Sequence, residues 1–262
     1  MGVQMFTTSH FIWIGISIFL IVIVSLLLIR YKCPSKKLLT VCLGFSVLCE
    51  IVKTLSNMVE TDLYTNMSVP VKILPVSSLP LQLCSLQIFF FFYLFFGKNE
   101  KLKADLNCFM CMCMLVGAPF AILLPNSSTS FTNPVAYQFF LYHAMIIIYA
   151  IYQIKTHQVT YTMRNLKIDL GLLGVLTICS IWINSIFAAT GHPTNFFYTM
   201  CPPADHLPYL NMNQGWEMYL LKLVLLGLVL SLIYHAPFLL KKKKSYCLFF
   251  LWTICLNCLS DF

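Results

Sequence analysis

Two residues that could carry out acyl transfer, a cysteine and a histidine, stand out in this apolar chain. Cys84 lies in the stretch 79–85 (LPLQLCS), where a proline at position 80 precedes a row of aromatic residues. Proline is favoured in the first turn of a helix, because the N–H that it lacks would have no partner there. We therefore expect Cys84 within the first two turns of a membrane helix, where the positive end of the helix dipole favours a thiolate. An inert, buried cysteine is the alternative interpretation.

His143 is the second candidate, because ionisable side chains inside membrane helices are costly and are often functional. It lies about nine residues into an apolar run, which places it ~13 Å from the start of that helix. A thiol nucleophile and a histidine base at similar depth are the pair that acyl transfer through a thioester needs. A histidine that only packs inside the bundle is the alternative.

Other polar residues lie in or beside the apolar runs. Glu50 and Lys53 are three residues apart, so they share a helix face and can neutralise each other. We interpret them either as a structural ion pair or as a site for a lipid head group. Asn184 and Lys222 lie in later runs without an evident partner. The long segment 191–215 contains aromatic residues and prolines but little charge, which predicts an ordered cap over the bundle.

The composition places these residues in a membrane. Apolar residues make up 59% of the chain, charged residues make up 10%, and the mean hydropathy is +0.81. A soluble domain has about 25% charged residues. We expect one all-α domain, a bundle of seven transmembrane helices, each of about 20 residues. The expected spans cover residues 11–29, 38–58, 80–96, 106–124, 135–154, 168–188 and 216–239.

The basic residues predict the orientation of the chain. Of the 17 lysines and arginines, 14 lie after the first, third, fifth and seventh expected spans. The positive-inside rule therefore predicts an outer N-terminus and a cytoplasmic C-terminus. The net charge of +8 is then a signal of topology and not of a nucleic-acid partner. This orientation places the polar candidates in the outer half of the bundle, and we expect the apolar tail 245–262 to be an interfacial segment.

The 12 cysteines do not suggest a secreted disulfide framework, since most of them lie inside apolar runs. The spacing of Cys108, Cys111 and Cys113 resembles a metal motif superficially. No histidine lies nearby in the sequence, and we interpret this run as lipid-facing packing. We expect neither a metal nor a cofactor.

The stretch 79–85 resembles the signature of the YwaF family of seven-helix integral membrane proteins. The resemblance extends from the second expected span to the seventh. It implies lipid chemistry, because eukaryotic relatives of that family transfer a fatty acyl chain to ether lysophospholipid through a cysteine thioester. Cys84 stands at the matching cysteine position. The further matching residues follow in order: His143, Asn195, Met200, Pro202-Pro203 and Gly215-Trp216.

The resulting hypothesis is a membrane-embedded acyltransferase. Cys84 would accept an acyl chain from a donor phospholipid, and His143 would serve as the base before a lysophospholipid acceptor takes the chain. Gln82, or backbone N–H groups at the start of the third expected span, would stabilise the oxyanion, and Asn195 would orient the imidazole or the head group. We expect an integral multi-pass membrane protein, in the cell membrane if the host is bacterial. The expected substrate-binding residues are Gln82, Asn195, Glu50 and Lys53.

Two other functions stay open at this point. A lipid hydrolase would use the same cysteine and histidine with water as the acceptor. A transporter or receptor-like bundle would instead line a polar path with Glu50, Lys53 and His143, and Cys84 would only pack. The transporter predicts a mild effect of Cys84→Ser and a severe effect of Glu50→Gln, whereas the acyltransferase predicts the reverse order.

Overall fold

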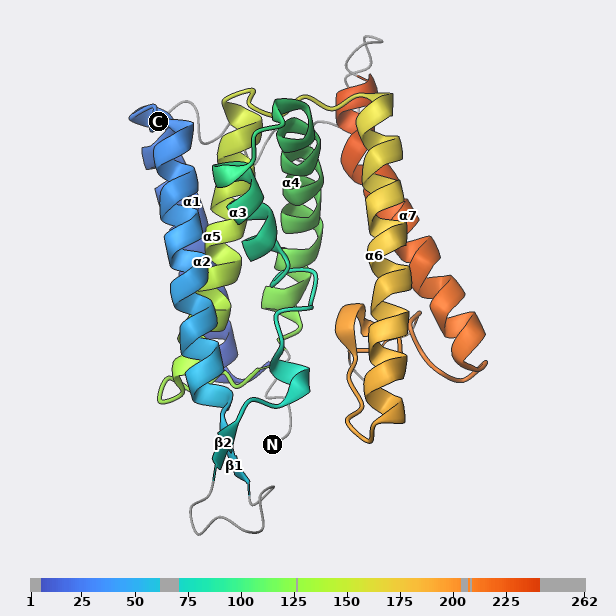
Figure 1. Cartoon of the computed structure of the whole chain (residues 1–262). Helices are drawn as coiled ribbons and strands as arrows, with labels where there is room; N and C mark the ends of the chain where they lie inside the picture. Colours follow the sequence, from blue (N-terminus) through green and yellow to red (C-terminus); the bar gives the residue numbers. More distant parts are fainter. Residues whose placement is uncertain (1–5, 62–70, 126, 204–206, 208, 241–262) are drawn as a thin grey trace.

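A computed structural model describes residues 6–61, 71–125, 127–203, 207 and 209–240. Within this part of the chain the fold is all-α, as predicted, apart from one two-stranded hairpin (Figure 1). Strands β1 (Val59–Thr61) and β2 (Val71–Ile73) pair antiparallel at one end of the bundle. The helices are α1 (Thr8–Arg30), α2 (Ser35–Asn57), α3 (Gln87–Phe96), α4 (Glu100–Leu123), α5 (Pro134–Lys155), α6 (Met163–Ala189) and α7 (Trp216–Leu240).

Six of these helices, all except α3, are long and apolar enough to cross a membrane. Their positions agree with six of the seven expected spans, although α4 and α6 begin several residues earlier than expected. Both early starts have the same cause, which is a polar side chain that caps the helix. The Asn99 side chain accepts a hydrogen bond from the N–H of Leu102, and Thr162 forms a capping box with Asn165. Polar first turns therefore extend these helices beyond their apolar runs.

The expectation of a span over residues 80–96 is wrong in its first half. α3 begins only at Gln87, so its 10 residues extend ~15 Å, about half of the hydrocarbon core of a bilayer. Leu79, which precedes Pro80, has an extended backbone with φ −58° and ψ 148°, because proline disfavours the helical conformation of the residue before it. The chain enters the bundle from the hairpin end as an irregular stretch and then forms α3 (Figure 1). Irregular backbone at this depth requires protein partners for its polar groups.

The apolar core lies around α4 and α5. α5 packs against α1, α2 and α4. The rings of Trp13 and Phe140 stack at an interplanar angle of 3°, and Phe91 meets Tyr149 edge to face. The expectation of a lipid-facing cysteine run in α4 is wrong, because these three cysteines are at most 5% exposed and contribute to the core: Cys108, Cys111 and Cys113.

Successive connections between the helices lie alternately at the two ends of the bundle. Strands β1 and β2 and the segment 190–203 lie at one end, while the short turns 31–34, 97–99 and 156–162 lie at the other (Figure 1). This grouping is the one that the basic residues suggested, but which end faces the cytoplasm stays a prediction. The tail 245–262 lies outside the described residues.

Candidate functional site

Cys84 lies in an irregular turn three residues before α3 and is half-buried. The expected position within the helix is therefore wrong by about one turn. Its carbonyl oxygen accepts hydrogen bonds from the Tyr142 hydroxyl at 2.7 Å and from the N–H of Gln87 at 3.3 Å. Within the described chain, the backbone N–H groups of Leu83, Cys84 and Ser85 donate no hydrogen bond, and the Cys84 Sγ makes none. Three consecutive N–H groups of the Cys84 turn are thus free to donate.

His143 is buried in α5, and its ring lies 4.4 Å from that of Phe139. Its Nδ1 lies 2.7 Å from the carbonyl oxygen of Phe139. A carbonyl oxygen can only accept, so we assign the hydrogen to Nδ1, which leaves the lone pair on Nε2. This tautomer is the one that a general base needs.

Tyr142 connects the two candidates, because it is the neighbour of His143 in α5 and holds the carbonyl of Cys84. No hydrogen bond joins Cys84 directly to His143 among the described residues. The expectation that their side chains face each other stays a prediction. Glu50 is in electrostatic range of the same Tyr142 hydroxyl, so this part of α2 borders the site.

Glu50 and Lys53 form the ion pair that their spacing predicts. Lys53 Nζ lies 2.8 Å from Glu50 Oε1, and the two side chains are 15% and 23% exposed. The two charges therefore neutralise each other within α2, on the side that borders Tyr142. A zwitterionic group could replace this internal pairing, since it carries both charges.

Gln82 and Asn195 come together, although 113 positions separate them in the sequence. Gln82 Nε2 donates to the carbonyl oxygen of Asn195 at 3.0 Å, and Gln82 Oε1 accepts from the N–H of Phe197 at 3.0 Å. The Asn195 side chain closes its own loop by accepting from Met200 N and donating to the Cys201 carbonyl oxygen. Both amides therefore hold the loop 194–201 against the Cys84 turn.

Side chains from α6 and α7 hold the other face of the loop 194–201. Asn184 in α6 is fully buried and makes hydrogen bonds to Thr194, Phe196 and Thr199. The partner that the sequence left open for Asn184 is thus this loop. In α7, the Trp216 indole donates to the Thr199 carbonyl oxygen at 2.9 Å. This dense bonding confirms the expectation of an ordered cap for residues 194–201.

The loop 194–201 also contains two strained residues. Phe197 and Tyr198 adopt left-handed φ angles of 57° and 54°. Bulky residues rarely adopt this conformation, which persists only where the surroundings impose it. The Tyr219 hydroxyl in α7 holds the Tyr198 carbonyl, and Gln82 holds the Phe197 N–H. The loop is therefore fixed from both sides.

The sequence interpretation missed a buried ionisable pair between α6 and α7. His235 Nε2 lies 3.1 Å from Asp169 Oδ2, and both side chains are at most 1% exposed. His235 Nδ1 lies 2.9 Å from the Ser231 carbonyl oxygen, so Nδ1 carries a hydrogen. The sequence could have revealed this pair, because Asp169 and His235 are ionisable residues inside expected spans and such residues are often functional.

Gln87, the first residue of α3, was also missed. It is fully buried, and its Nε2 donates to the Leu83 carbonyl oxygen at 3.2 Å. Its Oε1 has no hydrogen-bond partner in the described structure. A buried acceptor without a partner is costly, and this one lies in the helix turn that follows Cys84.

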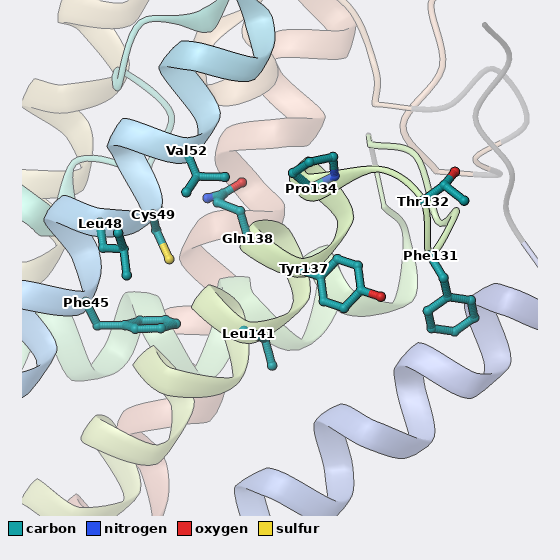
Figure 2. A pocket seen from close by; sticks show the side chains of 10 residues that line it. All are labelled: Phe45, Leu48, Cys49, Val52, Phe131, Thr132, Pro134, Tyr137, Gln138 and Leu141. Atoms are coloured by element: carbon teal, nitrogen blue, oxygen red, sulfur yellow. The ribbon is translucent and has the colours of Figure 1, made fainter.

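Two hollows lie near these residues. The larger is a surface groove of about 460 Å³ between α2, α5 and the segment 131–134, with Cys49 and Leu141 among its lining residues (Figure 2). Neither Cys84 nor His143 lines this groove. The smaller is a cavity of about 120 Å³ that α4, α6 and α7 form together with Leu83, the residue before Cys84.

Comparisons with known proteins identify the family. A family model described as the TMEM164 family matches residues 5–235. No curated protein and no solved structure matches the chain. The family comparison does not confirm the YwaF name that the motifs suggested. With its six long apolar helices, the protein is an integral multi-pass membrane protein, and the extent of the match shows that the chain belongs to the TMEM164 family.

Proposed function

We propose that this protein is a membrane-embedded acyltransferase that moves a fatty acyl chain from a phospholipid to a lysophospholipid through a Cys84 thioester. One observation supports this proposal above the others. The buried His143 has its Nδ1 hydrogen directed at the Phe139 carbonyl oxygen, so its Nε2 is free to act as a base beside the Cys84 turn. The proposal takes Sγ and Nε2 to be in contact directly or through one water molecule.

The proposed reaction has two halves, which are acylation of Cys84 and transfer of the acyl chain to the acceptor. In the first, His143 Nε2 takes the proton from the Cys84 thiol, the sulfur attacks the ester carbonyl carbon, and the C–O ester bond breaks. The departing lysophospholipid oxygen takes the proton from His143. In the second half, the hydroxyl of the acceptor gives its proton to Nε2 and attacks the thioester, the C–S bond breaks, and the sulfur regains a proton.

The oxyanion of each half is stabilised by backbone donors. The N–H groups of Leu83, Cys84 and Ser85 are free, and preorganised N–H groups are effective oxyanion stabilisers. Gln82 positions the loop 194–201 through both ends of its amide, and the second hydrogen of its Nε2 is left to donate to the oxyanion. Asn195 orders the same loop from within.

The head groups of the two lipids are assigned to the Glu50 and Lys53 pair. These charges lie in α2 next to the Tyr142 hydroxyl that holds the Cys84 carbonyl. A zwitterionic head group can exchange partners with an ion pair without leaving a buried charge unpaired.

Labelling with a lipid tests this proposal. A phospholipid with a labelled acyl chain is expected to leave a label on the protein that hydroxylamine removes, and Cys84→Ala is expected to abolish it. His143→Ala is expected to slow labelling by about 10²–10⁴-fold. Cys108→Ala is the matched control, because Cys108 bonds the Thr160 carbonyl oxygen at the other end of the bundle. Lipid turnover that persists in the Cys84→Ala protein contradicts the proposal.

A transporter is a second candidate, which the buried ionisable pairs favour. Asp169 with His235 and Glu50 with Lys53 lie inside the bundle, where such groups often line ion paths. The two functions predict opposite orders of severity for two variants. A transporter loses activity in Glu50→Gln and keeps it in Cys84→Ser, whereas the acyltransferase shows the reverse. Release of free fatty acid in place of acyl transfer identifies a hydrolase.

A further inference from the structure

The small cavity between α4, α6 and α7 has an entirely uncharged lining. Leu83, Cys113 and Leu230 contribute apolar side chains to it. Its one hydroxyl, that of Ser231, already donates to the Gly227 carbonyl oxygen at 2.8 Å. The lining is therefore predominantly apolar, and apolar cavities of this kind bind apolar molecules.

The cavity exists because two facing helices carry glycine where they line it. A Cβ atom at Gly117 in α4 would meet no atom within 4 Å. A Cβ atom at Gly227 in α7 would meet only the Leu173 side chain, at 3.5 Å. Side chains at these two positions would therefore occupy space that is now empty.

The cavity lies beside the candidate nucleophile. Leu83, which lines the cavity, is the residue before Cys84. Leu83 also packs against the buried cluster of Phe109, Met112 and Cys113 in α4. The irregular turn before α3 therefore contributes Leu83 to this cavity, whereas the larger groove in Figure 2 has no lining residue from that turn.

We propose that this cavity binds part of the fatty acyl chain that Cys84 carries, an inference that rests on the proposed function. A volume of about 120 Å³ holds about four methylene groups if each takes roughly the ~30 Å³ of a water molecule. The acyl chain is the apolar part of the substrate that is attached at the sulfur, so it is the occupant that reaches the cavity. The cavity thereby selects long acyl chains over an acetyl group.

Photo-crosslinking with the full chain tests this inference without relying on turnover. The probe is a phosphatidylcholine whose acyl chain carries a diazirine, used as a series with the diazirine at successive carbons. For at least one position we expect crosslinks in the α4 segment around Gly117 and the α7 segment around Gly227. Gly117→Leu fills the cavity and is expected to remove these crosslinks. Gly174→Leu is the matched control, since Gly174 is an exposed helical glycine with open space around it.

A second measurement compares a long-chain donor with an acetyl donor. Gly117→Leu is expected to lower the ratio of long-chain to acetyl loading of Cys84 by about tenfold or more, the effect of losing one or more methylene contacts. Gly227→Ala, a smaller change, is expected to lower the ratio in the same direction if Gly117→Leu does not fold.

The outcomes separate this inference from the proposed function. Crosslinks that remain in Gly117→Leu, or that map to the groove around Leu141, overturn the cavity assignment even if Cys84 forms a thioester. If crosslinks map to the cavity but no hydroxylamine-sensitive label forms, the cavity is still a lipid site and the proposed acyltransferase function is overturned.

Discussion

The two sides of this bundle bury opposite kinds of residue. Around α4 and α5 the fully buried side chains are large and apolar, such as Met110, Phe140 and Ile146. In α6 the buried side chains include a single apolar residue, Leu166, while the rest are polar. The exposed surface of α6 is apolar, with Trp182 at 69% exposure. Because lipid is as apolar as leucine, burial of apolar area does not hold α6 and α7 in place.

This difference means that different interactions hold the helices together on the two sides of the bundle. Close packing of apolar surfaces holds α1 to α5, whereas hydrogen bonds and two ionisable pairs, Asp169 with His235 and Arg164 with Asp105, hold α6, α7 and the loop 194–201. Cys84 lies where these two regions meet. Tyr142 from the first region holds its carbonyl oxygen, and Gln82, two residues earlier, holds the loop of the second. Both regions thus position the Cys84 turn.

The largest expected effect comes from breaking the pair of Asp169 and His235. His235→Leu leaves the Asp169 carboxyl buried without a partner and is expected to lower the free energy of unfolding by about 3–5 kcal/mol. The double variant Asp169→Leu/His235→Leu removes both polar groups and is expected to lose less. Thermal unfolding in detergent measures both. A double variant that is less stable than His235→Leu would contradict a polar origin for the stability of this region.

A smaller loss is expected in the apolar region. Trp13 is 2% exposed and stacks on Phe140, so Trp13→Ala is expected to cost about 3 kcal/mol, the low end for such a truncation. Lipid can partly solvate the new surface, which keeps the loss at this end of the range. Trp182→Ala on the lipid-facing side of α6 is the control, with an expected change within about 0.5 kcal/mol. Equal losses at the two tryptophans would show that burial does not distinguish the regions.

Gln82→Ala is expected to disconnect the two regions and to lower the free energy of unfolding by about 2 kcal/mol. It removes two hydrogen bonds to the loop 194–201, each of which contributes about 1 kcal/mol. Misplacing the groups around a nucleophile can slow a reaction about 10²-fold, so we expect thioester formation to slow by that order. Gln158→Ala is the control, because Gln158 is an exposed glutamine at the other end of the bundle. An unchanged labelling rate in Gln82→Ala would show that the loop does not position the site.

The sequence predicts one of these regions better than the other. Apolar runs of sufficient length located all six long helices, because the bilayer fixes their length. The ion pair of Glu50 and Lys53 followed from helical spacing alone. The start of α3 did not follow, because a proline suits both the first turn of a helix and an extended stretch. The bond between Gln82 and Asn195 joins residues 113 positions apart, which no local pattern reveals.

The smallest expected effect is a gain in stability where the two regions meet. Gln87 is fully buried, and its Oε1 has no hydrogen-bond partner in the described structure. Gln87→Met removes that acceptor at nearly constant volume and is expected to raise the free energy of unfolding by about 1 kcal/mol, because an unmade buried hydrogen bond costs about 1–3 kcal/mol. The variant also loses the bond from Nε2 to the Leu83 carbonyl oxygen, which reduces the gain.

A residue that weakens the fold in this way is expected to serve the reaction, since natural proteins keep such acceptors at functional sites. We therefore expect Gln87→Met to slow transfer to the lysophospholipid several-fold while formation of the Cys84 thioester continues, because the unpartnered Oε1 lies in the helix turn that follows Cys84. Separate measurement of labelling and of label transfer distinguishes these two steps. Gln153→Met is the control, because Gln153 is a buried glutamine whose Oε1 already accepts from Asn107 at 3.2 Å, so the same change there is expected to destabilise. If Gln87→Met destabilises the protein as much as Gln153→Met, then Gln87 is an ordinary packing residue and the acceptor has no role in transfer.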